Sequence, residues 1–297
     1  RKKLDKYHLQ TLQTLQSAPT RTSTAGVYVT IGMLPIMAYI HKRWLTLLGS
    51  ILRSNNKTMK SWTLYMAATK PTSSKSWFID VQKLLAEYHL PALTQLYDNI
   101  PSKLQWKKQV SDAIHTYWQS ELLTEVATRS SLKYLTPPRG GLPHICWSSV
   151  ESNCKDVRRA QIKHRLLTGT YLLNETISKF SNSQTDATCP LCFAENEDLC
   201  HFLFHCSALS EHRKLLANFI SQLRSAVLST AFQETTADES KLAQIIIDPT
   251  QAADVHPDKL MQLETTSRRL CFNLHSKRIF LMKMLSWTTL NPWVCDH

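Results

Sequence analysis

The stretch CPLCFAENEDLCHFLFHC, residues 189–206, holds the most specific pattern in the chain, and the rest of the fold is expected to form around it. Its spacing is C-x₂-C-x₈-H-x₄-C, with candidate metal ligands Cys189, Cys192, His201 and Cys206. Two thiolates on a tight turn form one edge of a tetrahedron. A His and a Cys about one and a half turns apart on a short helix form the other edge. The spacing therefore predicts a metal site.

The donor types and their number indicate which metal this is. Thiolate and imidazole ligands suit Zn²⁺ better than Mg²⁺ or Ca²⁺. Four protein ligands leave no position for a catalytic water, so we expect a structural Zn²⁺ ion. Cys200 and His205 are alternative donors next to two of the ligands. We favour His201 and Cys206, because residues 202–204 can then pack behind the metal. The alternative to a metal site is a set of free, buried cysteines.

Apolar residues recur with helical spacing along most of the chain. The clearest stripes lie in residues 36–51, 75–90, 101–129 and 260–285. A break at Gly32-Met-Leu-Pro35 precedes the first of them, and Pro257 precedes the last. The chain has only six glycines and no convincing alternating strand. We therefore predict an all-α fold, with multi-helix lobes and a small structural zinc knuckle.

Clusters of helix-breaking residues suggest where the chain divides. The strongest is TPPRGGLP, residues 136–143, and weaker ones lie at residues 55–56 and 71–74. Polar residues 181–187 and 230–240 are expected to be loops. We predict five segments: helices in 1–70, a helical connector in 71–136, a basic helical segment in 144–188, the knuckle in 189–206 and C-terminal helices in 207–297.

The uncharged run Thr22–Ile40 contains two glycines and a proline, so we expect two core helices with a break and no membrane span. The chain begins with Arg1, which suggests a piece of a longer polypeptide. Eight cysteines in a chain with a metal-type pattern indicate a reducing, intracellular compartment.

The charge balance points to a polyanionic partner. The chain has 35 basic and 23 acidic residues, a net charge of +12. Nucleic acid is the usual partner of so basic a protein. The alternative is a basic surface without a partner.

The densest basic segment is the expected helix at residues 155–165, which carries Lys155, Arg158, Arg159, Lys163 and Arg165. Lys155, Arg159 and Lys163 fall at i, i+4 and i+8, on one helical face. We predict that this helix contacts a phosphate backbone without reading sequence. A solvated helix face is the alternative. Weaker basic sets lie at residues 41–43 and 268–278.

Two residues beside the metal ligands are candidates for base contacts. Leu191 and Phe193 flank Cys192, and zinc knuckles bind unpaired bases through such side chains. Packing within the knuckle is the alternative for both.

No enzymatic constellation is recognisable in the sequence. It has no Gly-rich phosphate loop, no G-x-S-x-G motif and no adjacent pair of aspartates. Pro257-Asp258 lacks the second acid closely followed by a lysine that a restriction-type nuclease site requires. We therefore predict no catalytic residue in this chain.

Several motifs together resemble the reverse transcriptases of non-LTR (LINE-type) retrotransposons. Gly32-Met-Leu-Pro-Ile36 and the following Ile40-His41-Lys42 resemble the segment after the catalytic palm in that family. Further similar stretches are Trp147-Ser148, AQIKHRLLTGTY at 160–171, Phe180, the knuckle with Glu197-Asp198 and His201-Phe-Leu203, and Arg213. The resemblance covers residues 20 to 215, and residues 216–297 match only loosely.

The resemblance implies a function and a place in a longer protein. In this family the region carries the thumb and a C-terminal RNA-binding domain with a zinc knuckle, whose ligands fall on the four residues named above. The polymerase aspartates lie upstream of this region. The resemblance implies that the chain holds template RNA and DNA during target-primed reverse transcription, for a palm domain of the same polypeptide, in the nucleus and cytoplasm. The competing hypothesis is a relic or domesticated zinc-stapled helical interaction module.

Overall fold

The computed structural model describes residues 2–180, 186–227, 229–252 and 255–290. Helices form nearly all of its regular structure, and within those ranges the β pairing is limited to an isolated bridge between Thr188 and Asn196. The predicted all-α fold is therefore confirmed. The chain forms two compact units, which are described separately: Arg1–Leu12 with Met33–Glu125, and Gln13–Gly32 with Val126–His297.

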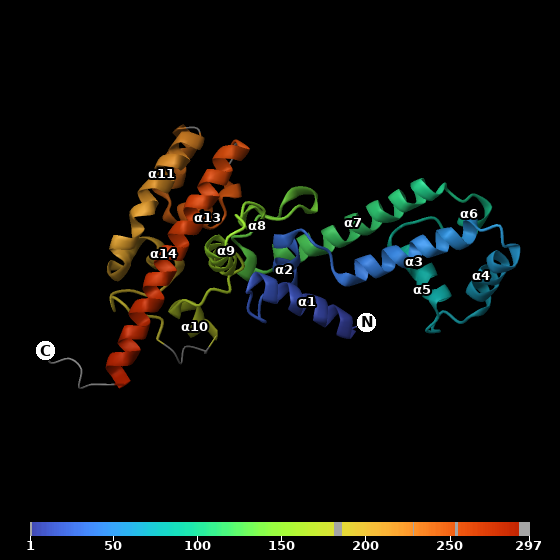
Figure 1. Cartoon of the computed structure of the whole chain (residues 1–297), viewed down its shortest axis with the longest axis horizontal. Coiled ribbons are helices and arrows are strands. Elements are labelled where there is room, and N and C mark those ends of the chain that lie inside the picture. Colours follow the sequence, from blue (N-terminus) through green and yellow to red (C-terminus); the bar gives the residue numbers. More distant parts are fainter. Residues whose placement is uncertain (1, 181–185, 228, 253–254, 291–297) are drawn as a thin grey trace. The chain divides into compact units, whose positions relative to one another are not determined.

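The first unit is a helical assembly around one apolar core (Figure 1). Its helices are α1 (Lys2–Gln16, as far as residue 12), α3 (Ile36–Arg53), α4 (Lys57–Thr69), α5 (Trp77–Glu87), α6 (Leu93–Asp98) and α7 (Lys103–Thr128, as far as residue 125). Leu45, Leu48, Leu85, Trp106 and Val110 are fully or almost fully buried in this core. These residues come from α3, α5 and α7, whose apolar stripes the sequence predicted.

Close packing of α3 against α7 depends on Gly49. The indole Nε1 of Trp106 donates a hydrogen bond to the carbonyl oxygen of Leu45, 2.8 Å away. A Cβ atom added at Gly49 would lie only 2.2 Å from Cδ1 of Trp106. A side chain at position 49 would therefore displace the buried indole ring.

The second unit is built around the long helix α14 (Pro257–Leu290), which contacts α9 (Cys154–Leu167), α11 (Lys214–Ala226) and η4 (Ser207–Arg213) (Figure 1). Its other helices are α2 (Thr24–Ile31), α8 (Ile145–Ser148), α10 (Asn174–Phe180), α12 (Ser229–Ala237) and α13 (Glu239–Ile247). Single turns are η1 (Ser130–Leu132), η2 (Arg139–Gly141), η3 (His201–His205) and η5 (Pro249–Gln251).

The predicted helices and the predicted break are confirmed. The four apolar stripes correspond to α3, α5, α7 and α14. Between α2 and α3, Gly32 adopts a left-handed conformation with φ of 65°. A Cβ atom there would approach the carbonyl oxygen of Gly141 to 2.6 Å, so glycine is required both by the backbone angle and by this contact.

Two expectations about loops need revision. The prediction of a loop at residues 230–240 is wrong, because α12 and the start of α13 occupy this segment. Asp238 caps α13 by accepting hydrogen bonds from the backbone of Ser240 and Lys241, and the apolar face of α13 is buried. Of the other expected loop, 181–187, residues 181–185 lie outside the described residues.

The Pro- and Gly-rich segment at 136–143 belongs to the second unit and does not separate the two units. The side chain of Asp248 accepts a hydrogen bond from the backbone N–H of Thr136 at 2.7 Å, and the side chain of Gln251 donates to the carbonyl oxygen of Tyr134 at 3.0 Å. The assignment of the five sequence segments to separate functional domains stays a prediction.

Within the described residues, no single helix is long and apolar enough to cross a membrane. Helices α2 and α3 meet the criteria of length and composition only when they are taken together across the break between them.

Candidate metal centre

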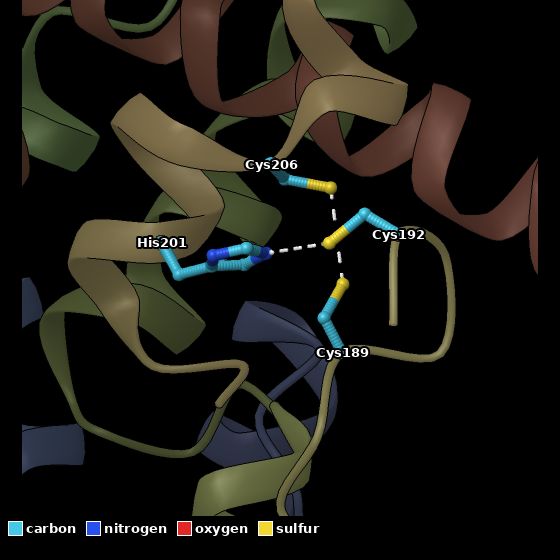
Figure 2. A group of neighbouring side chains, drawn as sticks. All are labelled: Cys189, Cys192, His201 and Cys206. Atoms are coloured by element: carbon cyan, nitrogen blue, oxygen red, sulfur yellow. Dashed lines mark hydrogen bonds between the residues drawn. The ribbon is translucent and has the colours of Figure 1, made fainter. Parts of the chain in front are cut away.

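Four side chains from two parts of the knuckle converge on one point (Figure 2). The ligand atoms of Cys189, Cys192, His201 and Cys206 all lie within 4.8 Å of one another. Cys189, His201 and Cys206 are buried, and Cys192 is partly exposed. These are the four residues that the sequence spacing selected, and they form a compact possible metal site.

The distances suit a tetrahedral ion. The Sγ atoms of Cys189 and Cys206 are 3.8 Å apart, and Sγ of Cys192 lies 3.3 Å from Nε2 of His201. With metal–sulfur and metal–nitrogen bonds of about 2.3 and 2.0 Å, a tetrahedron has S–S edges of about 3.8 Å and S–N edges of about 3.5 Å. These two edges therefore fit a tetrahedral ion, and the 4.8 Å limit on the remaining donor–donor distances is compatible with one ion between the four residues.

Local backbone structure explains how the two cysteines of the turn are held. The bridge between Thr188 and Asn196 flanks the turn, and the N–H of Cys189 donates to the carbonyl oxygen of Glu195 at 2.8 Å. Phe193 follows Cys192 with φ of 56°, a left-handed conformation that is unfavourable for a residue with a side chain. Phe193 is 70% exposed, so packing within the knuckle does not explain this left-handed conformation.

The second pair of ligands lies on and just after η3, a single π-helical turn. Of the three residues expected to pack behind the site, Phe202 and Leu203 are buried and Phe204 is half-buried. Arg213 donates hydrogen bonds to the carbonyl oxygens of Leu203 and Cys206 at 2.9 and 2.7 Å. These bonds tie Arg213 of η4 to the backbone of the turn that carries the ligands, and the carbonyl oxygen of Cys206 also accepts from the N–H of Leu209 at 3.1 Å.

One carboxylate contacts the imidazole of His201, and a second holds the backbone of the same residue. Its Nδ1 lies 3.2 Å from Oε2 of Glu195, and its backbone N–H donates to Asp198 at 2.7 Å. With the proton on Nδ1, Nε2 is left with a free lone pair directed at the cysteines. Such a carboxylate partner is common around metal-binding histidines, where it fixes the tautomer.

The three thiols have different proton affinities. Burial, and then the neighbouring Cys189 thiol, raise the pKa of Cys206 to about 12. Burial also raises the pKa of Cys189. Burial acts in the same direction on Cys192, but hydrogen bonds, first from the backbone of Ala194, outweigh it and lower its pKa. Because a cation is needed to ionise the other two thiols, metal binding would release protons here.

The neighbouring candidate donors lie outside the cluster. Nε2 of His205 lies 2.8 Å from Oε2 of Glu239, and this histidine is not part of the four-residue group. Cys200 is also outside the group and is half-buried.

A buried ion pair joins the knuckle to α14. Glu197 lies between the two ligand pairs, and Nε and Nη2 of Arg278 donate to its two carboxylate oxygens at 2.6 and 2.7 Å. One of these oxygens also accepts from the N–H of Asn174 at 2.8 Å. Tyr171 packs under the Arg278 guanidinium, 5.9 Å from it. The knuckle is therefore anchored to the helical core of the second unit, which the sequence did not predict.

The predicted phosphate-contacting residues on α9 differ in their exposure to solvent. Lys155 and Arg158 are exposed, and Arg159 and Arg165 are half-buried. Nη1 of Arg159 lies 3.5 Å from the carboxylate of Asp156. Lys163 is fully buried, so the prediction that it contacts a phosphate backbone is wrong.

The surroundings of Lys163 explain its burial. Its ammonium group lies 3.2 Å from Oε2 of the equally buried Glu264. It also donates to the carbonyl oxygen of Ile246 at 2.8 Å and to the hydroxyl of Ser267. The face of α9 that carries Lys163 therefore points toward α14, and the helical period alone could not distinguish this face from a solvated one.

The weaker basic sets are also partly internal. Arg268 is buried, with Nη2 3.2 Å from Asp156, and it donates to Ser149. Nδ1 of His41 lies 2.6 Å from the hydroxyl oxygen of Tyr88, whereas Lys42 is hydrogen-bonded to Ser111 in an exposed position. Of the four basic residues at 268–278, Arg269 remains exposed and Lys277 is half-buried.

No protein-family model, curated protein or solved structure matches this chain. The resemblance to retrotransposon reverse transcriptases therefore depends on the quoted sequence motifs, and the metal centre depends on its own geometry.

Proposed function

We propose that this chain is a non-catalytic, nucleic-acid-binding part of the reverse transcriptase of a non-LTR retrotransposon. It would comprise thumb-like helices and a C-terminal domain with a structural Zn²⁺ ion. Its task is to hold template RNA and DNA for a palm domain of the same polypeptide during target-primed reverse transcription. The observation that carries the proposal is the Cys₃His cluster, formed by residues whose spacing resembles that of the family's knuckle.

The zinc ion in this proposal has a structural task. When bound, it supplies four strong bonds that join the Cys189–Cys192 turn to η3. The three thiolates and the imidazole match the ligand preference of Zn²⁺. The contacts of Glu197 with Arg278 and with the backbone of Asn174 then connect the knuckle to α14 and to the start of α10.

The distribution of charge supports a polyanionic partner. Among the described residues, the charges of the buried side chains nearly cancel, because three are basic and four are acidic. The excess of +12 is therefore carried by exposed and half-exposed side chains. Lys155 and Arg158 are two of these at the start of α9, and the exposed ring of Phe193 offers a surface on which an unpaired base can stack.

Metal analysis tests the first part of the proposal. The purified chain should contain one zinc per molecule. Cys192→Ser should lose it, and Cys200→Ser, which removes a neighbouring cysteine outside the cluster, should retain it. Full metal content in Cys192→Ser would contradict the ligand assignment.

A second experiment tests nucleic-acid binding. Replacing Lys155 and Arg158 with Gln should weaken binding of single-stranded RNA and lower the slope of log K against log salt by about 0.7 for each lost phosphate contact. The matched control is Lys214→Gln with Arg224→Gln, which removes the same charges from exposed positions on α11. Equal slopes in both double variants would contradict the assignment of α9 to the nucleic-acid interface.

The competing function is that of a zinc-stapled helical interaction module without a polymerase partner. The observation that favours it is the internal use of Lys163, Arg268 and Arg278, each paired with a buried carboxylate. A zinc-loaded chain that folds but binds neither RNA nor single-stranded DNA would support this alternative. The proposed function also predicts that the chain alone performs no RNA-templated DNA synthesis with primer, dNTPs and Mg²⁺.

A further inference from the structure

The second unit contains a basic cavity apart from the metal ligands. Its volume is about 500 Å³, within the range of small-molecule sites. Three segments line it: the end of α1 with the loop that follows, the end of α9 with the loop that follows, and one turn of α14. The lining residues that matter for its chemistry are Ser17, Arg21, Arg165, Leu172, His275 and Arg278.

Arg165 is held in place by an unusual helix end. Ser17 follows α1 with φ of 52°, and the N–H of Ala18 donates to the carbonyl oxygen of Gln13 at 2.8 Å. Glycine usually occupies such a left-handed position. Nε and Nη2 of Arg165 donate to the carbonyl oxygen and hydroxyl of Ser17, both at 3.0 Å. These bonds use two of the five guanidinium N–H groups, and three remain.

Arg21 adds a second guanidinium. Its Nη2 donates to the carbonyl oxygen of Thr170 at 2.7 Å, which leaves four N–H groups. Among the described residues, neither Arg21 nor Arg165 has a carboxylate partner, whereas Arg278 is neutralised by Glu197. No Asp or Glu is among the described residues that line the cavity.

The electrostatic potential in the cavity is therefore positive, and it affects the pKa of His275, which lines the cavity. Burial first, and then the positive charges of Arg165 and Arg278, lower the pKa of His275 to about 4. Nδ1 of His275 lies 2.9 Å from the hydroxyl oxygen of Tyr171. The cavity also has apolar lining, including Leu172, which is 41% exposed, and Ile279.

We propose that this cavity binds the phosphate group of a nucleotide, with Arg21 and Arg165 as its charged partners and the apolar lining beside the sugar and base. Arginine suits this role because its planar fork matches the oxygen atoms of a phosphate. The phosphate is that of an unpaired nucleotide in a bound strand, so the inference rests on the proposed function and assigns a subsite to it. A free nucleotide carries the same chemistry and is distinguished by experiment.

The test uses the zinc-loaded full chain and a labelled single-stranded RNA. Arg21→Gln with Arg165→Gln removes both charges. Ala18→Phe fills the cavity, which Ala18 lines, and leaves both arginines in place. The matched control is Arg139→Gln with Arg224→Gln, which removes two exposed arginines of the same unit. Zinc content and melting temperature check that every variant folds. A second arm measures uridine 5′-monophosphate by calorimetry.

We expect the double cavity variant to bind RNA about 25-fold more weakly at 0.1 M salt, because each single-strand phosphate contact contributes about fivefold there. Ala18→Phe should also weaken binding, and the control should not. If RNA binding is unchanged but the mononucleotide binds the unmodified chain and not Ala18→Phe, the site takes free nucleotides, and its assignment to a strand is overturned.

Two further outcomes separate this inference from the proposed function. RNA and mononucleotide binding that are both insensitive to the cavity variants would overturn the cavity site while leaving nucleic-acid binding elsewhere on the chain intact. A chain that binds the mononucleotide in the cavity but no RNA would support the phosphate site and contradict the proposed function.

Discussion

Replacement of Glu264 by Leu should strongly destabilise the second unit. Glu264 and Lys163 are both fully buried with their charged atoms 3.2 Å apart, and the change leaves the ammonium group with only Ser267 and the carbonyl oxygen of Ile246. Removing one partner of a buried ion pair costs about 3–5 kcal/mol. For a unit of this size, each kcal/mol lowers the melting temperature by about 2–4 °C, so we expect a decrease of about 6–20 °C.

The matched control is the double variant Lys163→Met with Glu264→Leu. Replacing both charges with apolar side chains of similar size should restore most of the stability. Calorimetry, with hydrogen exchange of α9 and α14 to identify the unit that unfolds, measures the effect. A Glu264→Leu variant as stable as the unmodified chain would refute the reasoning. So would a Lys163→Gln variant that keeps its stability and loses RNA affinity, since Lys163 would then face a phosphate.

Three further predictions concern separate parts of the chain. Gly49→Ala should destabilise the first unit by about 1–3 kcal/mol in urea denaturation, because its Cβ atom would clash with Trp106; unchanged stability would contradict the packing. Burial lowers the pKa of His164 to about 3, so its contribution to stability is complete above pH 6.5 and is lost as the pH falls toward 3. In the unfolded chain this histidine has a pKa near 6.5 and becomes protonated first, so the free energy of unfolding should fall by about 2 kcal/mol between pH 6.5 and pH 5. His164→Asn should remove this part of the pH dependence. Phe193→Gly should raise stability by about 1 kcal/mol by relieving its left-handed backbone, yet weaken RNA binding by about 1–3 kcal/mol if a base stacks there; undiminished binding would exclude the stacking.

The sequence predicted the features that depend on local pattern. Helical periodicity located α3, α5, α7 and α14. Apolar residues that recur at helical spacing over about 11 residues or more fit a helix and do not fit a strand. The spacing from Cys189 to Cys206 selected four residues that the fold brings together, because their donors are close in sequence. The loop at 230–240 was mispredicted since polar composition also fits an exposed helix.

Features that depend on distant residues were beyond sequence reasoning. The direction of Lys163 is set by Glu264, about one hundred positions away. The cavity arises where Ser17, Arg165 and His275 meet, and no local pattern links them. The bidentate ion pair of Glu197 and Arg278 likewise joins residues that lie far apart in the sequence.

The salt dependence of RNA binding by the zinc-loaded, unmodified chain tests the central claim most directly. If Lys155, Arg158, Arg21 and Arg165 each contact one phosphate of a single strand, log K should fall linearly with log salt with a slope of about −3. Removal of zinc with a chelator should abolish the part of the binding that requires a folded knuckle. A slope near zero, or no detectable binding at 50 mM salt, would contradict the account.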